Sequence, residues 1–168
     1  MPTPPEVLEG AVKGAAALGT DEAGLALNSV VWSDVPASIV CEALKGIAKI
    51  IPRSGENVRA QLLKSLERAL LTHSSGNVRA LAAEYLGAHG QKEHAAYLAA
   101  TSLRDSEEYV RNSAKKGLAE LAKRHGLSVP EVRHSLEKAL GTRPPASLVR
   151  RREETIAFVD RLMKCPKQ

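Results

Sequence analysis

Residues 105–126 read DSEEYVRNSAKKGLAELAKRHG, and the spacing of apolar residues in this stretch indicates how the chain folds. Apolar side chains recur every three or four positions, so they gather on one side of an α-helix, and charged side chains occupy the other side. The apolar positions are Val110, Ala114, Leu118, Leu121 and Ala122. This pattern predicts a half-buried helix rather than a strand.

The beginning of this helix recurs along the chain. The shared pattern is Val-Arg-x-x-[Ala/Leu]-x-x-x-Leu, and its four copies begin at Val58, Val78, Val110 and Val132. A degenerate fifth copy begins at Val40, where Cys41 occupies the position of the arginine. Val40, Val78 and Val110 are separated by 38 and 32 residues, which is about the length of one helical hairpin. The sequence therefore predicts a repeated hairpin.

Turn and capping residues divide the chain into nine predicted helices. Thr20 precedes two acidic residues and is expected to cap a helix, and Ser128 with Glu131 has the spacing of a capping box. Gly90 and Gly126 each follow a histidine, and we expect both to close helices in the left-handed conformation. The nine predicted segments are 4–19, 21–33, 36–52, 54–72, 75–89, 91–104, 106–125, 128–141 and 145–165.

The repeated hairpins predict the architecture. A hairpin of this length cannot bury enough apolar surface alone, so each one must pack its second side against the next hairpin. We therefore predict an all-α fold, a right-handed α-solenoid of about four stacked helical hairpins plus an N-terminal capping helix. The prediction is a single domain over residues 1–168, with the capping helix at 1–19, four hairpins at 20–165 and a frayed tail at 166–168.

A resemblance to a known family supports this architecture. The run Asp-Ser-x-x-x-Val-Arg-x-x-Ala-x-x-x-Leu at residues 105–118 resembles a HEAT repeat, particularly the short HEAT-like repeats of bilin lyases and many bacterial proteins. The likeness is good over 105–126, fair over 54–90, and faint over 36–52 and 128–141. The other residues match the family only as helices.

The resemblance also implies particular roles for residues. In the family, an aspartate at the turn between helices and the arginine of the second helix form a stabilising ladder between repeats. Here only Asp105 stands properly before such an arginine, Arg111. The second helices of stacked hairpins line a concave surface, which is the usual binding face. A role in handling a bilin chromophore is an alternative that rests on repeat similarity alone.

Motifs for catalysis are scarce in this chain. It has no Walker loop, no paired-glycine dinucleotide loop, no His-Glu-x-x-His and no nucleophile elbow. His89 and His94 are close in sequence, but the helix break at Gly90 points their imidazoles apart, so we expect no metal site. Cys41 lies on a mostly apolar helix and is expected to be an inert thiol. We therefore predict a non-enzymatic protein with no cofactor and no bound metal.

Aromatic residues make up only 3% of the chain, so Ala and Leu must fill the interior. Trp32, the only tryptophan, ends the second predicted helix beside Val30 and Val31. It is either a packing anchor or, if it is half exposed, a hot spot for a partner. The low aromatic content also argues against a glycosylase, because such an enzyme needs aromatic side chains to hold a damaged base.

Basic residues are the feature that bears most on function. The formal net charge is +5, which permits contact with anionic partners. Under the predicted pairing of helices, ten basic residues lie on the second helices of the hairpins. They are Lys45, Lys49, Arg79, Arg111, Lys115, Lys116, Lys123, Arg150, Arg151 and Arg152. These charges either present an electropositive groove that binds a partner, or form a solvated face that neighbouring glutamates partly offset.

The sequence supports two classes of function. The first is a protein–protein interaction scaffold or adaptor that binds a protein partner through a preformed concave surface. The alternative is nucleic-acid binding through the basic concave groove, without sequence specificity. The two differ in salt dependence, because phosphate binding releases counterions from the nucleic acid.

Composition and the N-terminal residues bear on location and assembly. The first ten residues have no basic n-region and no long apolar core, so we expect no secretory signal, and no stretch approaches the length of a membrane span. Cys41 and Cys165 do not make a disulfide framework, which favours the reducing cytoplasm. The first predicted helix is weakly polar, so we predict a monomer or a homodimer that forms through this N-terminal helix.

Overall fold

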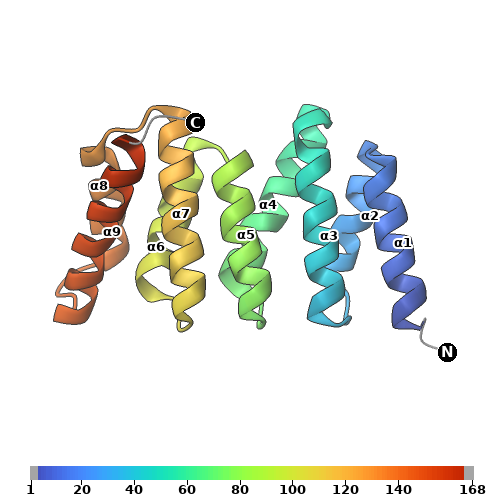
Figure 1. Cartoon of the computed structure of the whole chain (residues 1–168), viewed down its shortest axis with the longest axis horizontal. Coiled ribbons are helices and arrows are strands. Elements are labelled where there is room, and N and C mark those ends of the chain that lie inside the picture. Colours follow the sequence, from blue (N-terminus) through green and yellow to red (C-terminus); the bar gives the residue numbers. More distant parts are fainter. Residues whose placement is uncertain (1–3, 165–168) are drawn as a thin grey trace. The chain divides into compact units, whose positions relative to one another are not determined.

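A computed structural model describes residues 4–164, and every regular element in this range is a helix (Figure 1). Nine α-helices and two short 3₁₀ helices follow one another along these residues. In chain order they are α1 (Pro5–Leu18), α2 (Asp21–Val31), α3 (Ala37–Ile50), η1 (Ile51–Arg53), α4 (Glu56–Thr72), α5 (Gly76–His89), η2 (Lys92–His94), α6 (Ala95–Arg104), α7 (Glu108–His125), α8 (Val129–Leu140) and α9 (Ala146–Lys164). The prediction of an all-α solenoid built from helical hairpins is confirmed. The tail predicted at 166–168 lies outside the described residues.

Two predicted helices are interrupted by a short 3₁₀ turn. The predicted helix 36–52 ends at Ile50 and continues as η1, because Pro52 has no N–H to donate to a helical hydrogen bond. The predicted helix 91–104 begins with η2, where the backbone N–H of Gln91 donates to Nδ1 of His94 at 2.9 Å. Side-chain capping therefore sets the start of η2, which leads directly into α6.

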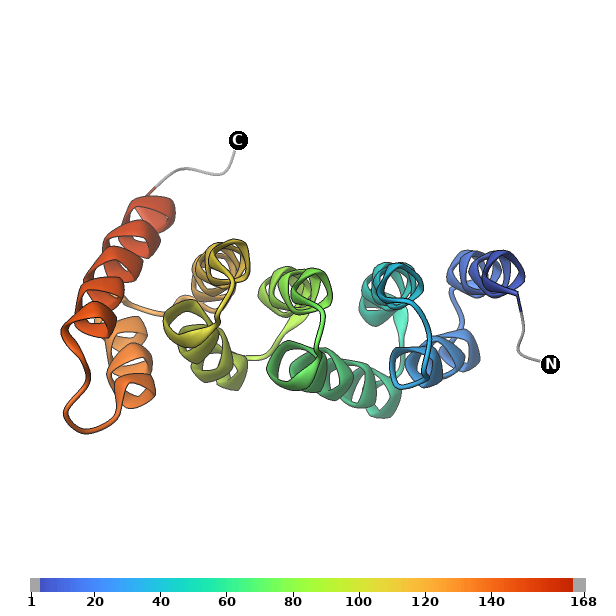
Figure 2. The same cartoon turned by 90° about the horizontal axis from the view of Figure 1, so that it is seen from below.

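Contacts divide the chain into two compact units, Met1–Ala82 and Ala83–Gln168, and the boundary falls inside α5. In the first unit α1 packs beside α3, while α2 packs against both α3 and α4. The helices of this unit therefore form two layers (Figure 2). Large aliphatic side chains fill its core and are almost completely buried. They include Leu27, Leu44, Ile47, Ile50, Leu62, Leu66 and Leu70.

In the second unit α6 packs against α7 and α8, and α9 packs against the same two helices. Its core is again aliphatic, and its fully buried residues include Leu86, Leu98, Leu103, Leu118, Leu121 and Leu136. The backbones of α5 and α7 approach closely at two glycines of this unit. A Cβ atom on Gly87 would lie 2.4 Å from Cα of Gly117, so neither position has room for a side chain.

The helix caps explain why the elements begin where they do. The hydroxyl of Thr20 accepts the backbone N–H of Ala23 at 3.2 Å, which confirms the predicted cap of α2. The predicted capping box at the start of α8 is also present. The backbone N–H of Ser128 donates to the carboxylate of Glu131 at 2.8 Å, and the N–H of Glu131 donates back to the hydroxyl of Ser128.

The two glycines expected to close helices behave differently. Gly126 follows α7 with a φ of 63°, as predicted for the left-handed conformation. The same prediction for Gly90 is wrong, because its φ lies outside the left-handed range. A Cβ atom on Gly90 would instead lie 2.3 Å from the carbonyl oxygen of Leu86. Close packing against the end of α5, rather than a positive φ, therefore requires this glycine.

Candidate interaction surfaces

Three of the four arginines of the repeated Val-Arg pattern bind the backbone of the turn before their own helix, whereas the fourth, Arg133, pairs with Glu153 at 3.3 Å. The guanidinium of Arg111 donates to the carbonyl oxygens of Asp105 and Ser106 at 2.8 and 2.9 Å. Arg79 bonds in the same way to two carbonyls before α5, both at 2.9 Å. Arg59 bonds to two carbonyls before α4, at 3.2 and 3.0 Å. Arg79 and Arg111, both predicted to bind a partner, thus hold turns of the fold.

Other arginines bind the last carbonyls of neighbouring helices. Arg104 donates to the final two carbonyls of α8, both at 2.9 Å. Arg124 reaches the carbonyl oxygen of Gly90, just after α5, at 2.5 Å. Arg151, another residue of the predicted basic face, donates to the carbonyl of Leu103 near the end of α6 at 2.9 Å. A cation is favourable at a helix C-terminus, where unpaired carbonyls carry partial negative charge.

The remaining arginines of the predicted face lie on α9 beside acidic residues. Arg150 is the most exposed of them, with 83% of its side chain accessible, and it forms an ion pair with Glu154 at 2.9 Å. Arg152 pairs with Glu153 at 2.6 Å. The positive charge of these two arginines is therefore offset locally, and an exposed pair such as Arg150–Glu154 contributes little free energy to folding.

Three of the five lysines of the predicted face are exposed to solvent, namely Lys45, Lys49 and Lys116. Lys45 is exposed on α3 and pairs with Glu42 at 2.5 Å, and Lys49 is exposed one turn later. On α7, Lys116 is exposed, while Lys115 and Lys123 are half-buried. We refer to Lys45 and Lys49 of the first unit as the α3 lysines, and to Lys115, Lys116 and Lys123 of the second unit as the α7 lysines.

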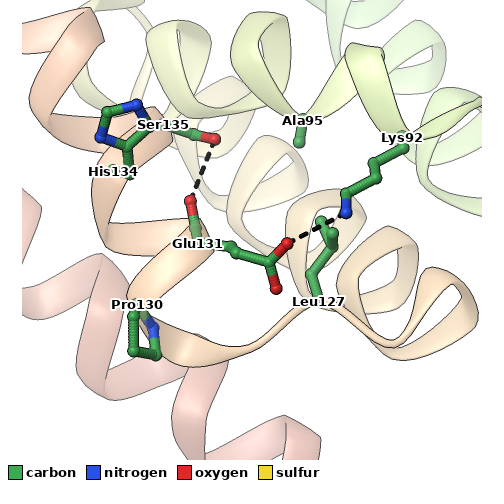
Figure 3. A pocket seen from close by; sticks show the side chains of 7 residues that line it. All are labelled: Lys92, Ala95, Leu127, Pro130, Glu131, His134 and Ser135. Atoms are coloured by element: carbon green, nitrogen blue, oxygen red, sulfur yellow. Dashed lines mark hydrogen bonds and ion pairs between the residues drawn. The ribbon is translucent and has the colours of Figure 1, made fainter.

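The second unit also has a surface pocket of about 390 Å³ that sequence reasoning missed (Figure 3). It lies where η2 and the start of α6 meet the turn before α8 and the first turns of α8. Its lining combines apolar side chains with a polar rim and consists of Lys92, Ala95, Leu127, Pro130, Glu131, His134 and Ser135. A recess of this kind can bury one apolar side chain of a partner.

The polar groups of the pocket could be mistaken for a catalytic triad, but their hydrogen bonds exclude this role. The carboxylate of Glu131 accepts from the backbone and hydroxyl of Ser128, both at 2.8 Å, and from Nζ of Lys92 at 3.0 Å. Ser135 donates its hydroxyl to the backbone carbonyl of Glu131 rather than to the imidazole of His134 (Figure 3). Nucleophilic catalysis needs a serine that donates to a general base.

The capping box makes the free energy of unfolding depend on pH in the acidic range. Hydrogen bonds from Ser128 and Lys92 hold the pKa of Glu131 at about 2, below its value in an unfolded chain. The depressed folded-state pKa means that this stabilisation is complete above about pH 4.3 and is lost as the pH falls toward 2. We expect Glu131→Gln to remove this part of the acid dependence. Urea denaturation at several pH values between 5 and 2 measures it.

Glu93→Gln is the matched control for that substitution, because Glu93 is exposed on η2 and forms no part of the capping box. The control should retain the wild-type decline of stability with acid. If Glu131→Gln retained it as well, the capping box would not be responsible for the decline.

Histidines and cysteine do not assemble a reactive centre in the described chain. His94 is buried with its Nδ1 accepting from Gln91 at 2.9 Å. His89 is half-buried, and burial together with the nearby guanidinium of Arg124 lowers the pKa of its imidazole. Burial raises the pKa of the half-buried Cys41 thiol, which reduces its reactivity at neutral pH. Among residues 4–164, no group of three or more histidine, cysteine, aspartate or glutamate side chains could hold a metal ion.

The face of α1 predicted to mediate a homodimer has two exposed apolar side chains. Val7 is 59% exposed and Leu18 is 73% exposed. Isolated exposed aliphatic residues are common on monomers, so these values do not distinguish the two states. The homodimer stays a prediction.

Comparison with known families decides what the repeats are. The model of the HEAT-repeat family matches residues 40–119 and again residues 63–157, which together cover more than half of the chain. The chain is a HEAT-repeat protein. HEAT-repeat proteins generally act as scaffolds for protein interactions and are typically not enzymes.

Two further findings describe this HEAT-repeat protein. No curated protein matches it significantly. Within the part of the chain that the structure describes, none of the helices combines the length and the apolar character that crossing a bilayer requires. The likeness to the repeats of bilin lyases in particular stays a prediction.

Proposed function

We propose that this HEAT-repeat protein is a non-enzymatic interaction module that binds acidic surfaces of a protein partner. The α7 lysines serve this role on the second unit and the α3 lysines serve it on the first, each unit taken by itself. The proposal rests on a difference between the arginines and the lysines of the predicted face. Three of the predicted arginines bind backbone carbonyls, as Arg111 does, whereas Lys49 and Lys116 are exposed to solvent. Exposed lysines on rigid helices attract a partner electrostatically without first disturbing the fold.

The arrangement favours a rigid mode of binding. Both α3 and α7 have closely packed inner faces, with Leu44, Ile47, Leu118 and Leu121 fully buried. Helices held in this way keep their backbone conformation when a partner docks, so little conformational entropy is lost on binding. We therefore propose a scaffold or adaptor whose surface is preformed, within a single repeat domain.

Charge reversal on α7 tests the proposal. We expect Lys115→Glu with Lys116→Glu to weaken capture of the partner from an extract of the native host at least about tenfold, or about 1.4 kcal/mol, because each reversal replaces attraction by repulsion. The measurement is a quantitative pull-down, followed by titration of the purified partner. Lys138→Glu with Lys164→Glu is a matched control, since it changes the net charge equally on α8 and α9. Equal capture by both variants would show that α7 is not the binding face.

The same preparations separate a protein partner from the nucleic-acid alternative. If the two α3 lysines and the three α7 lysines bound phosphates, the affinity for duplex DNA would fall as salt is added. A plot of log affinity against log salt concentration would then have a slope of about −4.5. Our proposal expects no such steep dependence and no measurable DNA binding near physiological salt. A steep slope that the Lys115/Lys116 reversal reduces would instead assign the lysines to nucleic acid.

A further inference from the structure

The only tryptophan of the chain lies at the surface of the first unit with an arginine stacked on it. Trp32 follows α2 directly and is 37% exposed. The guanidinium carbon of Arg68, on α4, lies 4.5 Å from the centroid of the Trp32 ring. A cation over an aromatic face at this distance is held by the ring quadrupole. The guanidinium therefore has a defined position at the surface.

The exposed side of α4 extends this feature in both directions. Lys64 and Leu71 are spaced four residues before and three residues after Arg68, so the three share one stripe of the helix. Lys64 is exposed, and Leu71 is 47% exposed, which is unusual for a leucine in this chain. We refer to Trp32, Lys64, Arg68 and Leu71 as the Trp32 patch. It combines two cations with two apolar surfaces.

The helices that carry the Trp32 patch are fixed to each other by polar contacts. The hydroxyl of Ser65 on α4 bonds to the side-chain oxygen of Asn28 on α2. The backbone N–H of Gly55, just before α4, donates to the carboxylate of Asp21 at 3.3 Å. These contacts hold α2 and α4 in register, so the patch is preorganised for binding.

The chemistry of Arg68 differs from that of the other arginines described above. Arg59, Arg79 and Arg111 each donate to backbone carbonyls, but among residues 4–164 the contact of the Arg68 guanidinium is the indole ring. The indole lies on one side of the guanidinium, and Arg68 is exposed, so a partner can reach the guanidinium from solvent. The planar fork of N–H donors of an arginine matches the two oxygens of a carboxylate.

We propose that the Trp32 patch docks a segment of a protein partner in which a carboxylate lies next to a large apolar side chain. The carboxylate accepts two hydrogen bonds from Arg68, with Lys64 adding attraction, and the apolar side chain covers Leu71 and the free part of the indole. Tryptophan and arginine are the residues most enriched at binding hot spots. This inference rests on the proposed function for the class of partner, but it uses a surface other than the lysines.

The geometry favours a protein segment over a nucleic acid. A base would stack on the face of Trp32, but the guanidinium of Arg68 already covers one face of that ring. A phosphate backbone has no apolar group to cover Leu71, which leaves that exposed side chain without a role. An acidic and apolar peptide satisfies all four residues of the patch.

Fluorescence of Trp32 provides a direct test, because the chain has no other tryptophan. The probe is a synthetic twelve-residue peptide that repeats Glu-Glu-Leu-Leu and has no aromatic residue. We expect a saturable change in the emission of the full-length protein with this peptide. We expect none with Lys-Lys-Leu-Leu or Glu-Glu-Ser-Ser repeats of the same length. A response to either of those two peptides equal to the first, or no saturable response to any peptide, would overturn the proposal.

Substitutions locate the peptide on the protein. Arg68→Glu and Leu71→Ser should each weaken the peptide at least about tenfold, and both side chains are exposed, so the helical circular dichroism should be unchanged. Arg161→Glu is the matched control, because Arg161 stacks on Phe158 of α9 at 5.7 Å and should not affect the titration. Unchanged affinity for Arg68→Glu would contradict the proposal.

Two further titrations distinguish this inference from a nucleic-acid site and from binding at the α7 lysines. Single-stranded oligo-dT should leave the emission of Trp32 unchanged, and a saturable response to it that exceeds the peptide response would make the patch a nucleic-acid site. The Lys115→Glu/Lys116→Glu variant should bind the peptide normally, which would support the patch whether or not the α7 lysines bind a partner. Loss of peptide binding in that variant but not in Arg68→Glu would overturn this inference and leave the proposed function standing.

Discussion

Replacing Gly117 with alanine is expected to lower the free energy of unfolding by about 2 kcal/mol. A Cβ atom at this position would lie 2.4 Å from the carbonyl oxygen of Ala83 and 3.4 Å from a methyl group of Leu98. The first of these neighbours is backbone, so α5 and α7 must move apart, at a cost of about 3 kcal/mol. The higher helix propensity of alanine returns about 1 kcal/mol. The cost of overpacking therefore exceeds the gain in helix propensity.

Thermal and urea denaturation measure this effect, and the midpoint of thermal unfolding should fall by about 4–8 °C. Gly14→Ala is the control, because a Cβ atom on Gly14 meets nothing within 4 Å and the residue lies inside α1. There the same chemical change should raise stability by up to about 1 kcal/mol. Two substitutions with the same sign would mean that the contact between α5 and α7 is not as close as the structure describes.

Replacing Arg111 with methionine is expected to cost about 2 kcal/mol of stability. The substitution keeps an apolar stem of similar length but removes the two hydrogen bonds to the carbonyls of Asp105 and Ser106. Hydrogen bonds to a charged group contribute about 1.5–3 kcal/mol, and solvent at the exposed carbonyl of Ser106 replaces part of this. Urea denaturation measures the change. Hydrogen exchange should show faster opening of the turn between α6 and α7.

Two companion variants make the result specific. Arg111→Lys should recover less than half of the loss, because a lysine cannot present the planar fork that spans both carbonyls. Lys116→Met, on the exposed side of the same helix, should change stability by less than about 0.5 kcal/mol. If Arg111→Met were as stable as the wild type, Arg111 would be available for a partner and the original prediction for it would stand.

The sequence predicted the helices well because each carries its own periodic apolar pattern and local caps. Val110, Ala114, Leu118, Leu121 and Ala122 are all buried, as their spacing indicated. The same reasoning could not tell which cations face solvent. Residue identity and helix position predict that a charge lies near a surface, but the acceptors of Arg111 are backbone atoms five and six residues away. Only the conformation of the turn brings those carbonyls to the guanidinium.

Features that depend on how one helix lies against another escaped prediction for a different reason. Lys92 and Glu131, which meet at the rim of the pocket, are far apart in sequence, and their contact depends on the register of α6 and α8. The close approach of Gly87 and Gly117 is only weakly indicated by the sequence. A glycine inside a helix costs about 1 kcal/mol relative to alanine, so its presence indicates a packing requirement without identifying the neighbour.

The arginine-to-carbonyl bonds have a consequence for how ionic strength acts on this protein. Carbonyl oxygens are neutral acceptors at short range and partly buried, so dissolved ions weaken these bonds only slightly. Attraction between an exposed lysine, such as Lys49 or Lys116, and a charge more than about 10 Å away is largely screened at 0.1 M salt. If the proposed function holds, raising the salt concentration should therefore release the acidic partner at a lower concentration than the one that loosens the hairpins. The proposed assembly and the folding of this protein should then respond to different ranges of salt concentration.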